Sequence, residues 1–275
     1  MILAIDIGNT NTVLGLFNDR TLVNSWRIKS DTRDTADELW VTIRSLLSTH
    51  GEKQNYPLLS RNDTHEIEIT GISLCSTVPA LLREMRTTIA RYFSNIPTVI
   101  VEPGTKTGVP LLVDNPKEIG ADRIVNSLAA HELYGKDSCA IVVDFGTSTN
   151  LDVVSPKGEF LGGALAAGIE ISVEAIAARA AQLRRVELIK PKNVIGKNTV
   201  EALQSGTIYG FAGQVDGLVK RIKVELMQAY PESGVPVVIA TGGLAPLVLG
   251  VAEEIDFHEP DLTLMGLEMI FERNS

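Results

Sequence analysis

The sequence is poor in the residues that define several common protein classes. It has two cysteines, Cys75 and Cys139, and four histidines among 275 residues. The cysteines lie far apart in apolar runs and form no C-x-x-C pair, and the histidines lack the spacing of a metal site. We therefore expect no zinc site and two buried free thiols.

An excess of positive charge is also missing, because the formal net charge is -9 at pH 7. Binding to nucleic acid or to a membrane surface needs a basic footprint, so we expect neither partner. A nucleotide ligand stays compatible with this charge. Small phosphates are commonly held by backbone N–H groups, helix N-termini and Mg²⁺ rather than by net charge.

No hydrophobic run has the character of a targeting or membrane segment. The N-terminus has no basic region and meets Asp6 after five residues, which is atypical of a signal peptide. Residues 233–252 contain no charged side chain and could span a bilayer, but Thr241-Gly242-Gly243 and Pro246 interrupt them. We expect a strand, a turn and a helix there, and a soluble, cytoplasmic protein.

No segment matches the pattern G-x-x-x-x-G-K-[ST], which excludes a P-loop nucleotide site. The sequence has an internal repeat instead. Residues 5–10 and 143–148 share the order apolar, Asp, apolar, Gly, polar, hydroxyl, and each segment follows a predicted strand. Strands alternate with helices around them, apart from a polar excursion expected over residues 51–66. This pattern predicts two related α/β halves, residues 1–115 and 116–275.

An Asp-x-Gly turn at the end of a strand suits a phosphate ligand. Glycine lets the backbone approach the ligand, the following N–H groups and hydroxyls can bind phosphate oxygens, and the Asp can hold a hydrated cation. Two such turns could face each other across a cleft and clamp a polyphosphate. Either turn alone could equally be a tight β-turn with an Asp cap. The interpretation as a phosphate site therefore depends on the presence of both turns.

A third segment, Thr241-Gly242-Gly243, joins a predicted strand to a predicted helix. The two glycines would leave a flat surface beside a helix N-terminus, where an adenosine or its α-phosphate could bind. The alternative is a strand-to-helix turn that needs glycine only for packing.

Asp122 and Arg123 lie in a mostly apolar helix that is predicted to begin at Asn115-Pro116 and to run to Leu133. Phosphoryl transfer needs a carboxylate that positions the attacking hydroxyl and cations that neutralise charge. Asp122 could therefore accept a hydroxyl proton while Arg123 holds substrate charge. A surface ion pair of little energetic consequence is the alternative.

The motifs around Asp6, Asp122, Asp144 and Gly242, in this order along the chain, resemble those of type III pantothenate kinases. These kinases belong to the superfamily of acetate and sugar kinases, Hsp70 and actin. The resemblance implies two ribonuclease-H-like (actin-like ATPase) domains with a central cleft. It also implies ATP-dependent phosphorylation of pantothenate to 4'-phosphopantothenate in coenzyme A biosynthesis, a homodimer, Mg²⁺, and a monovalent cation, K⁺ or NH₄⁺. The matching segments span nearly the whole chain: DIGNTNT (6–12), NPKEIGADR (115–123), DFGT (144–147), GGA (162–164) and TGG (241–243).

The resemblance also implies a role for individual residues. Asp122 would be the general base, Asp144 would bind the monovalent cation, and Asp6 would hold Mg²⁺ through water. We expect these three carboxylates to converge on a single cleft. Pantothenate would contact Gly120, Ala121, Asp122 and Arg123, and ATP would contact Asp6, Ile7, Gly8, Asn9, Thr10, Asn11, Thr12, Val13, Thr147, Gly242 and Gly243.

Three positions depart from the family's pattern. Val113 stands where an aromatic residue is usual, and Asn150 and Ala180 each stand where a threonine is usual. A missing hydrogen-bond partner commonly costs about 1–3 kcal/mol. The alternatives are a kinase for a different small hydroxylated acid and a catalytically weak or inactive regulatory paralogue. The presence of all three carboxylates favours an active pantothenate kinase.

Overall fold

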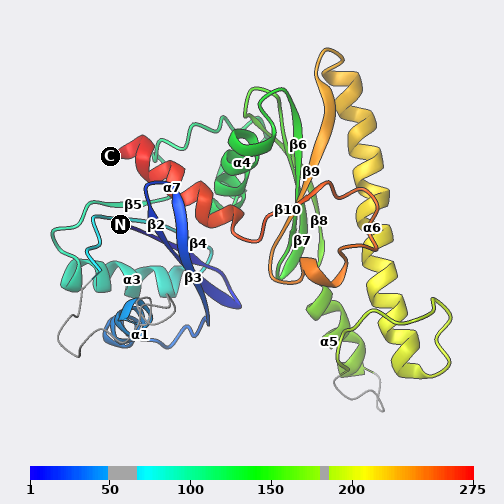
Figure 1. Ribbon diagram of the computed structural model, residues 1–275, viewed down its shortest axis with the longest axis horizontal. Coiled ribbons are helices and arrows are strands. Elements are labelled where there is room, and N and C mark those ends of the chain that lie inside the picture. Colours follow the sequence, from blue (N-terminus) through cyan, green and yellow to red (C-terminus); the bar gives the residue numbers. More distant parts are fainter. Residues whose placement is uncertain (49–66, 180–185) are drawn as a thin grey trace, which may run out of the picture. The chain divides into compact units, whose positions relative to one another are not determined.

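A computed structural model describes residues 1–48, 67–179 and 186–275 (Figure 1). The excursion expected over residues 51–66, and Ala180, lie outside these ranges. The described chain forms two compact units. Unit 1 comprises Met1–Thr107, Ile119–Val125 and Thr263–Ser275, and unit 2 comprises Gly108–Glu118 and Asn126–Leu262. The division of the sequence after residue 115 stays a prediction.

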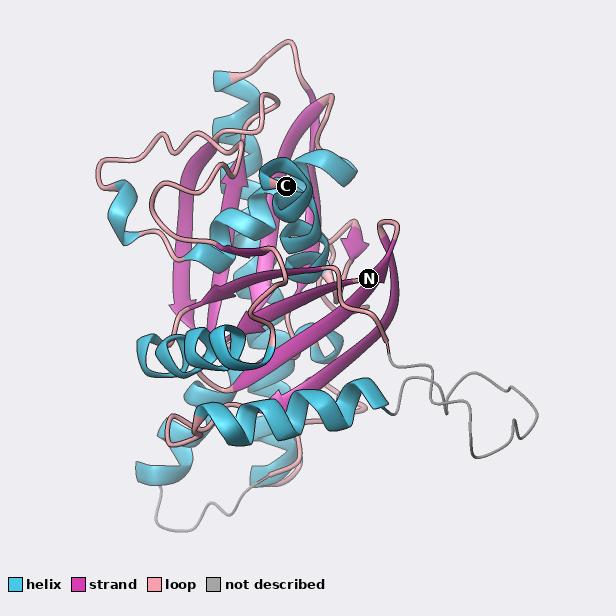
Figure 2. Ribbon diagram, turned by 90° about the vertical axis from the view of Figure 1, so that its left-hand side faces the viewer, coloured by secondary structure: helices cyan, strands magenta, loops and turns pink. Residues whose placement is uncertain are grey.

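Unit 1 contains a five-stranded sheet in the order β3-β2-β1-β4-β5. The first three strands pair antiparallel, and β4 and β5 continue the sheet parallel to β1. Helices flank the strands (Figure 2). The elements are β1 (Ile2–Ile7), β2 (Asn11–Asn18), β3 (Thr21–Lys29), α1 (Ala36–Ser48), β4 (Gly71–Ser76), α3 (Pro79–Tyr92), β5 (Thr98–Ile100) and α7 (Leu262–Asn274).

Alternate side chains of β1 point to opposite faces of this sheet, so the apolar core and Asp6 lie on different faces. Leu3, Ile5 and Ile7 are buried in a core that also contains apolar residues of α1 and α3. Because successive side chains point to opposite faces of a sheet, Asp6 lies on the other face. On that face α7 packs so closely that a Cβ on Gly71 would overlap the ring of Phe271. The candidate carboxylate is therefore kept out of the apolar core.

Unit 2 contains a second five-stranded sheet, in the order β10-β9-β6-β7-β8. The apolar residues of β6 pack with buried residues of α6, among them Val215 and Val219. The elements are β6 (Ser138–Phe145), β7 (Ser148–Val154), β8 (Phe160–Ala167), α5 (Ile169–Arg179), α6 (Thr199–Ala229), β9 (Gly234–Thr241) and β10 (Phe257–His258). Helix α4 (Ala121–Tyr134) begins in unit 1 and continues in unit 2.

The two sheets have one topology. In unit 2, β6 to β8 pair antiparallel in sequence order, while β9 and β10 continue the sheet parallel to β6. This repeats the order and directions of β1 to β5. The predicted fold class, α/β with two ribonuclease-H-like (actin-like ATPase) domains, is confirmed by this architecture and by the structural comparison below.

The predicted start of the helix at Asn115-Pro116 is wrong. Pro116–Glu118 forms a separate 3₁₀ turn, η1, and α4 begins at Ala121. The carbonyl oxygen of Gly120 accepts the N–H groups of Arg123 and Ile124 at 3.2 and 3.3 Å, so the helix starts at this glycine. Asp122 therefore lies in the first turn of a helix rather than in its interior.

The helix predicted after the glycine pair is also wrong. The structure has only the 3₁₀ turn η2 (Ala245–Leu247) there. Gly250 follows with a φ of 71°, which is incompatible with a continuing right-handed helix. Gly242 and Gly243 therefore do not lead into the N-terminus of a long helix. Among the described residues, no helix combines the length and apolar character needed to cross a bilayer.

Candidate active site

The first Asp-x-Gly segment forms the tight turn between β1 and β2. The N–H of Gly8 donates to the carbonyl oxygen of Asn11 at 3.0 Å and closes the turn. A Cβ on Gly8 would lie 3.0 Å from that same oxygen, so a larger residue would force the turn to shift. Asn9 and Thr10 are exposed at the tip. The turn thus presents short polar residues to a ligand.

Asp6 lies at the end of β1, opposite Val13 of β2 and Cys75 of β4. The thiol of Cys75 donates a hydrogen bond to Oδ1 of Asp6 at 3.3 Å. Burial raises the pKa of Asp6 from 3.8 to about 7, and the negative charge of Asp122 contributes in the same direction. A nearby cation would favour the ionised carboxylate and lower this pKa. The environment of Asp6 therefore fits a cation ligand.

Asp122 lies in the first turn of α4, at a position shaped by Gly120. A Cβ on Gly120 would overlap Oδ1 of Asp122, so glycine leaves the space that the carboxylate occupies. Burial raises the pKa of Asp122, and the hydrogen bond from the Arg123 N–H to Oδ1 at 2.9 Å opposes that rise. A raised pKa makes the carboxylate a better acceptor of a hydroxyl proton. Unit 1 thus brings together Asp6 and Asp122, which are far apart in sequence.

The second Asp-x-Gly segment forms the corresponding turn of unit 2. Asp144 lies near the end of β6, opposite Asn150 of β7 and Thr241 of β9. The N–H of Gly146 donates to the carbonyl oxygen of Ser148, two residues further on, at 3.0 Å, whereas Gly8 in unit 1 donates to Asn11, three residues further on. Both turns therefore begin with a glycine N–H donor, but the second turn is one residue shorter.

Gly242 packs directly against this second turn. A Cβ on Gly242 would overlap Oδ1 of Asp144 and would lie 2.7 Å from the backbone N and C atoms of Phe145. Its φ of 88° is in the region that favours glycine. The N–H of Leu244 donates to the carbonyl oxygen of Phe145 at 3.2 Å. The third motif thus joins the Asp144 turn within unit 2.

Gly168 is a further residue of this region to which the sequence analysis assigned no role. A Cβ there would overlap the carbonyl oxygen of Thr147 and lie 2.7 Å from that of Gly146. Gly168 follows β8 in a stretch of alanine and glycine, and no local pattern distinguishes it. Its role becomes visible only because the chain folds back onto the Asp144 turn.

The carboxylates fit a cation that is coordinated mainly by oxygens from outside the protein. Within the described ranges, no three His, Cys, Asp or Glu side chains gather as a metal site. Mg²⁺ commonly uses one or two carboxylates and completes its coordination with water and substrate phosphates. Asp6 in unit 1 and Asp144 in unit 2 could each contribute in this way.

Two of the three departures from the family pattern lie within the described residues. Asn150 is 8% exposed, and its Oδ1 is 3.1 Å from Oγ of Ser148, so its polar side chain has a partner inside unit 2. Val113 lies close to Gly162, where a Cβ would be 3.8 Å from Cγ1 of the valine. Neither residue disturbs the Gly146 to Ser148 hydrogen bond.

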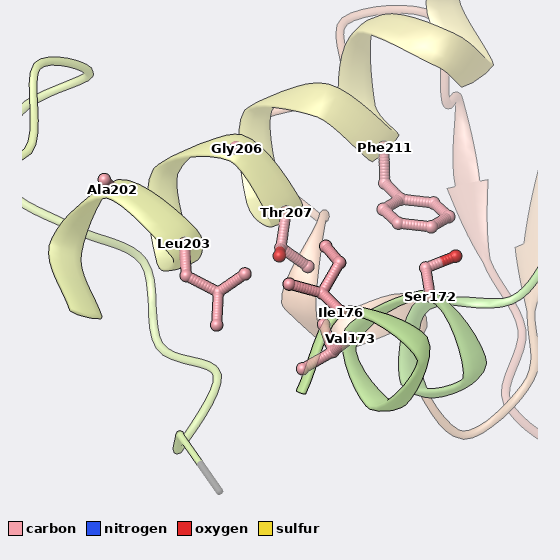
Figure 3. A pocket seen from close by; sticks show the side chains of 8 residues that line it. All are labelled: Ser172, Val173, Ile176, Ala202, Leu203, Gly206, Thr207 and Phe211. Atoms are coloured by element: carbon pink, nitrogen blue, oxygen red, sulfur yellow. The ribbon is translucent and has the colours of Figure 1, made fainter. Parts of the chain in front are cut away.

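A separate cavity of about 360 Å³ lies between α5 and α6 of unit 2. Figure 3 shows side chains from the two helices facing one another across it. None of the predicted site residues lines this cavity. Its lining residues are Ser172, Val173, Ile176, Ala202, Leu203, Gly206, Thr207 and Phe211.

Comparison with solved structures supports the fold. A conserved Baf family protein from Campylobacter jejuni matches with a TM-score of 0.58 and 16% identity over 99% of this chain and 98% of its own. At this level of identity, the similarity concerns the fold alone.

Comparison of sequences gives closer relatives. Type III pantothenate kinases from Frankia alni and Saccharopolyspora erythraea are 60% and 56% identical to this chain. The first alignment covers 100% of both proteins, and the second covers 100% of this chain and 99% of the relative. The family model "Type III pantothenate kinase" matches residues 2–221. The chain therefore belongs to the type III pantothenate kinase family.

Proposed function

We propose that the protein catalyses the ATP-dependent phosphorylation of pantothenate to 4'-phosphopantothenate, the first step of coenzyme A biosynthesis. Full-length similarity to type III pantothenate kinases supports this reaction. The structural observation that carries the proposal is the Asp122 carboxyl group, which is held at the start of α4 beside Arg123 and has a raised pKa.

Asp122 is the proposed general base. Its carboxylate accepts the proton of the substrate hydroxyl as that oxygen attacks the γ-phosphorus of ATP. The bond from the γ-phosphorus to the oxygen that bridges it to the β-phosphate breaks, and ADP leaves. Arg123 is proposed to hold negative charge of the substrate. Gly120 and Ala121 complete the proposed pantothenate contacts, and Gly120 also leaves room for the Asp122 carboxylate.

The proposed ATP contacts come from the motifs described above. When bound, Mg²⁺ neutralises phosphate charge, and Asp6 would hold it through water. Asp144 is the proposed ligand of a monovalent cation, K⁺ or NH₄⁺. The ATP-binding residues are proposed to be Asp6, Ile7, Gly8, Asn9, Thr10, Asn11, Thr12, Val13, Thr147, Gly242 and Gly243.

Three further proposals concern the domains, the oligomeric state and the cellular location of the protein. The two sheets of identical topology support a duplicated domain. We propose that the two actin-like domains are residues 1–115 and 116–275. A homodimer and a cytoplasmic location are proposed from the family resemblance. Size-exclusion chromatography with light scattering tests the dimer directly.

An assay of ADP release tests the reaction, with pantothenate, ATP, Mg²⁺ and either K⁺ or NH₄⁺. We expect turnover by the wild-type protein and a loss of about 10²–10⁴-fold in kcat for Asp122→Asn, the usual contribution of general-base catalysis. Asp137→Asn, at an exposed aspartate just beyond α4, is the control and should retain activity.

Two results would change the proposal. Robust turnover by Asp122→Asn would remove Asp122 from the role of base. A folded wild-type protein that binds ATP but phosphorylates no pantothenate-like alcohol would favour a regulatory paralogue. Turnover of another hydroxylated acid in preference to pantothenate would instead redefine the substrate.

A further inference from the structure

Ser30 follows β3 directly and contacts three residues of the β1–β2 turn. Its hydroxyl is 2.7 Å from the carbonyl oxygen of Gly8 and 2.9 Å from Oγ1 of Thr12. Its backbone N–H donates to the carbonyl oxygen of Thr10 at 3.0 Å. One residue outside the recognised motif therefore holds the beginning, the middle and the end of the turn.

The direction of these hydrogen bonds follows from the number of available protons. A carbonyl oxygen can only accept, so the single hydroxyl proton of Ser30 goes to Gly8. The Ser30 oxygen then accepts from Thr12, whose own proton is used in that bond. The result is a directed chain from Thr12 Oγ1 through Ser30 Oγ to the Gly8 carbonyl.

This chain has two consequences for a phosphate bound at the turn. The Gly8 carbonyl, whose partial negative charge would repel phosphate oxygens, is engaged by Ser30. Thr12 is 5% exposed, and its hydroxyl donates its proton to Ser30 inside the protein, so that proton is not available to a phosphate. Asn9 and Thr10 are the exposed residues at the tip of this turn.

We propose that Ser30 is a positioning residue that holds the Gly8–Thr12 turn in the conformation that binds the phosphates of ATP. This inference rests on the proposed function, because it requires that the turn binds a nucleoside triphosphate. It also changes the role of Thr12, which supports the turn from within instead of contacting ATP through its hydroxyl.

The experiment measures binding of a non-hydrolysable ATP analogue with Mg²⁺ by calorimetry, together with thermal unfolding. We expect Ser30→Ala to weaken analogue binding by about tenfold, the effect of one lost hydrogen bond whose partners are left unsatisfied. Ser30→Thr keeps the hydroxyl and should bind within about twofold of wild type. Ser25→Ala changes an exposed serine of the preceding strand, β3, and is the matched control.

A second variant tests the direction of the chain. Thr12→Val removes the outer donor but keeps the Ser30 to Gly8 bond, so we expect a smaller loss of about threefold to fivefold. Thr12→Ser should restore binding. The double variant Ser30→Ala/Thr12→Val should lose little more than Ser30→Ala alone, because both changes break one chain. Thr12→Val also carries the test if Ser30→Ala does not fold.

The outcomes separate this inference from the proposed function. Analogue affinity equal to wild type in Ser30→Ala and Thr12→Val, even with lowered thermal stability, overturns the positioning role and leaves a structural one. A wild-type protein that binds the analogue but does not phosphorylate pantothenate contradicts the proposed function and leaves the Ser30 comparison valid. A wild-type protein that binds no analogue overturns both.

Discussion

The two Asp-x-Gly turns occupy equivalent places in sheets of the same topology, but different groups support them. In unit 1, hydroxyls hold the turn through the chain that centres on Ser30, and a thiol contacts Asp6. In unit 2, the backbone of Gly242 and Gly168 packs against the turn, with no room for a side chain. The repeat has thus retained a glycine N–H donor at the start of each turn, while the turn length and the supporting groups differ.

The electrostatic settings of the two turns differ as well. Burial and the nearby charge of Asp122 raise the pKa of Asp6 to about 7. Asp144 lies opposite Thr241 of β9 and packs against Gly242. Unit 1 therefore combines two acidic groups, which suits the proposed roles of Asp6 toward Mg²⁺ and of Asp122 as base.

The largest expected effect tests the backbone support of the unit 2 turn. Gly242→Ala should destabilise the protein by about 2–4 kcal/mol, because it combines a left-handed backbone with overlap against Asp144 and Phe145. Gly213→Ala is the control, because a Cβ at this α6 position meets no atom within 4 Å. It should stabilise the helix by about 0.5–1 kcal/mol. Urea unfolding measures both, and equal stability of the two variants would contradict the packing argument.

Replacing Asp6 or Asp144 by asparagine tests whether the two turns bind different cations. Asp6→Asn should lower kcat by about 100-fold and raise the Mg²⁺ concentration needed for half-maximal activity, because a neutral amide holds a hydrated cation less well. Asp144→Asn should instead raise the K⁺ or NH₄⁺ requirement. Activity titrations with each cation distinguish the two. The same cation dependence in both variants would show that the turns are not specialised.

The pH dependence of kcat tests the base of unit 1. Asp122 must be ionised to accept a proton, and burial raises its pKa above the ordinary value of 3.8. Activity should therefore fall as the pH decreases through that raised pKa, by about tenfold per pH unit below it. With saturating Mg²⁺, which favours ionised Asp6, this acidic limb reports Asp122. Activity that stays constant down to pH 4 would contradict the assignment.

The smallest effect compares the two cysteines, one in each unit. Cys75→Ala removes the donor to Asp6 and should lower kcat/KM by about threefold to tenfold, as expected for one weak hydrogen bond to a charged group. Cys75→Ser keeps a donor and should recover most of this loss. Cys139→Ala removes a buried thiol from the core of unit 2 and should lower stability but not kcat/KM. Equal losses of activity in both alanine variants would show that the Cys75 effect comes from lost packing and not from the hydrogen bond to Asp6.

The local part of the fold was accessible from the sequence. The apolar runs predicted β1 and β6, and their shared Asp-x-Gly ending predicted two related halves, because strand ends and tight turns depend on neighbouring residues. Two helix predictions failed where glycine controls the backbone. Helix α4 begins after Gly120, later than Asn115-Pro116 suggested, and only a 3₁₀ turn that ends at Leu247 follows Gly243.

The sequence by itself determined the turn motifs, the family and the candidate base, because each depends on residue types in a fixed local order. Tertiary structure alone decided that Ser30 holds the first turn, that Gly168 and Gly242 pack against the second, and that the charge of Asp122 acts on Asp6. Each of these relations joins segments far apart in the chain. Their physical basis is the pairing of strands and the exclusion of side chains at close backbone contacts, which no local pattern of residues records.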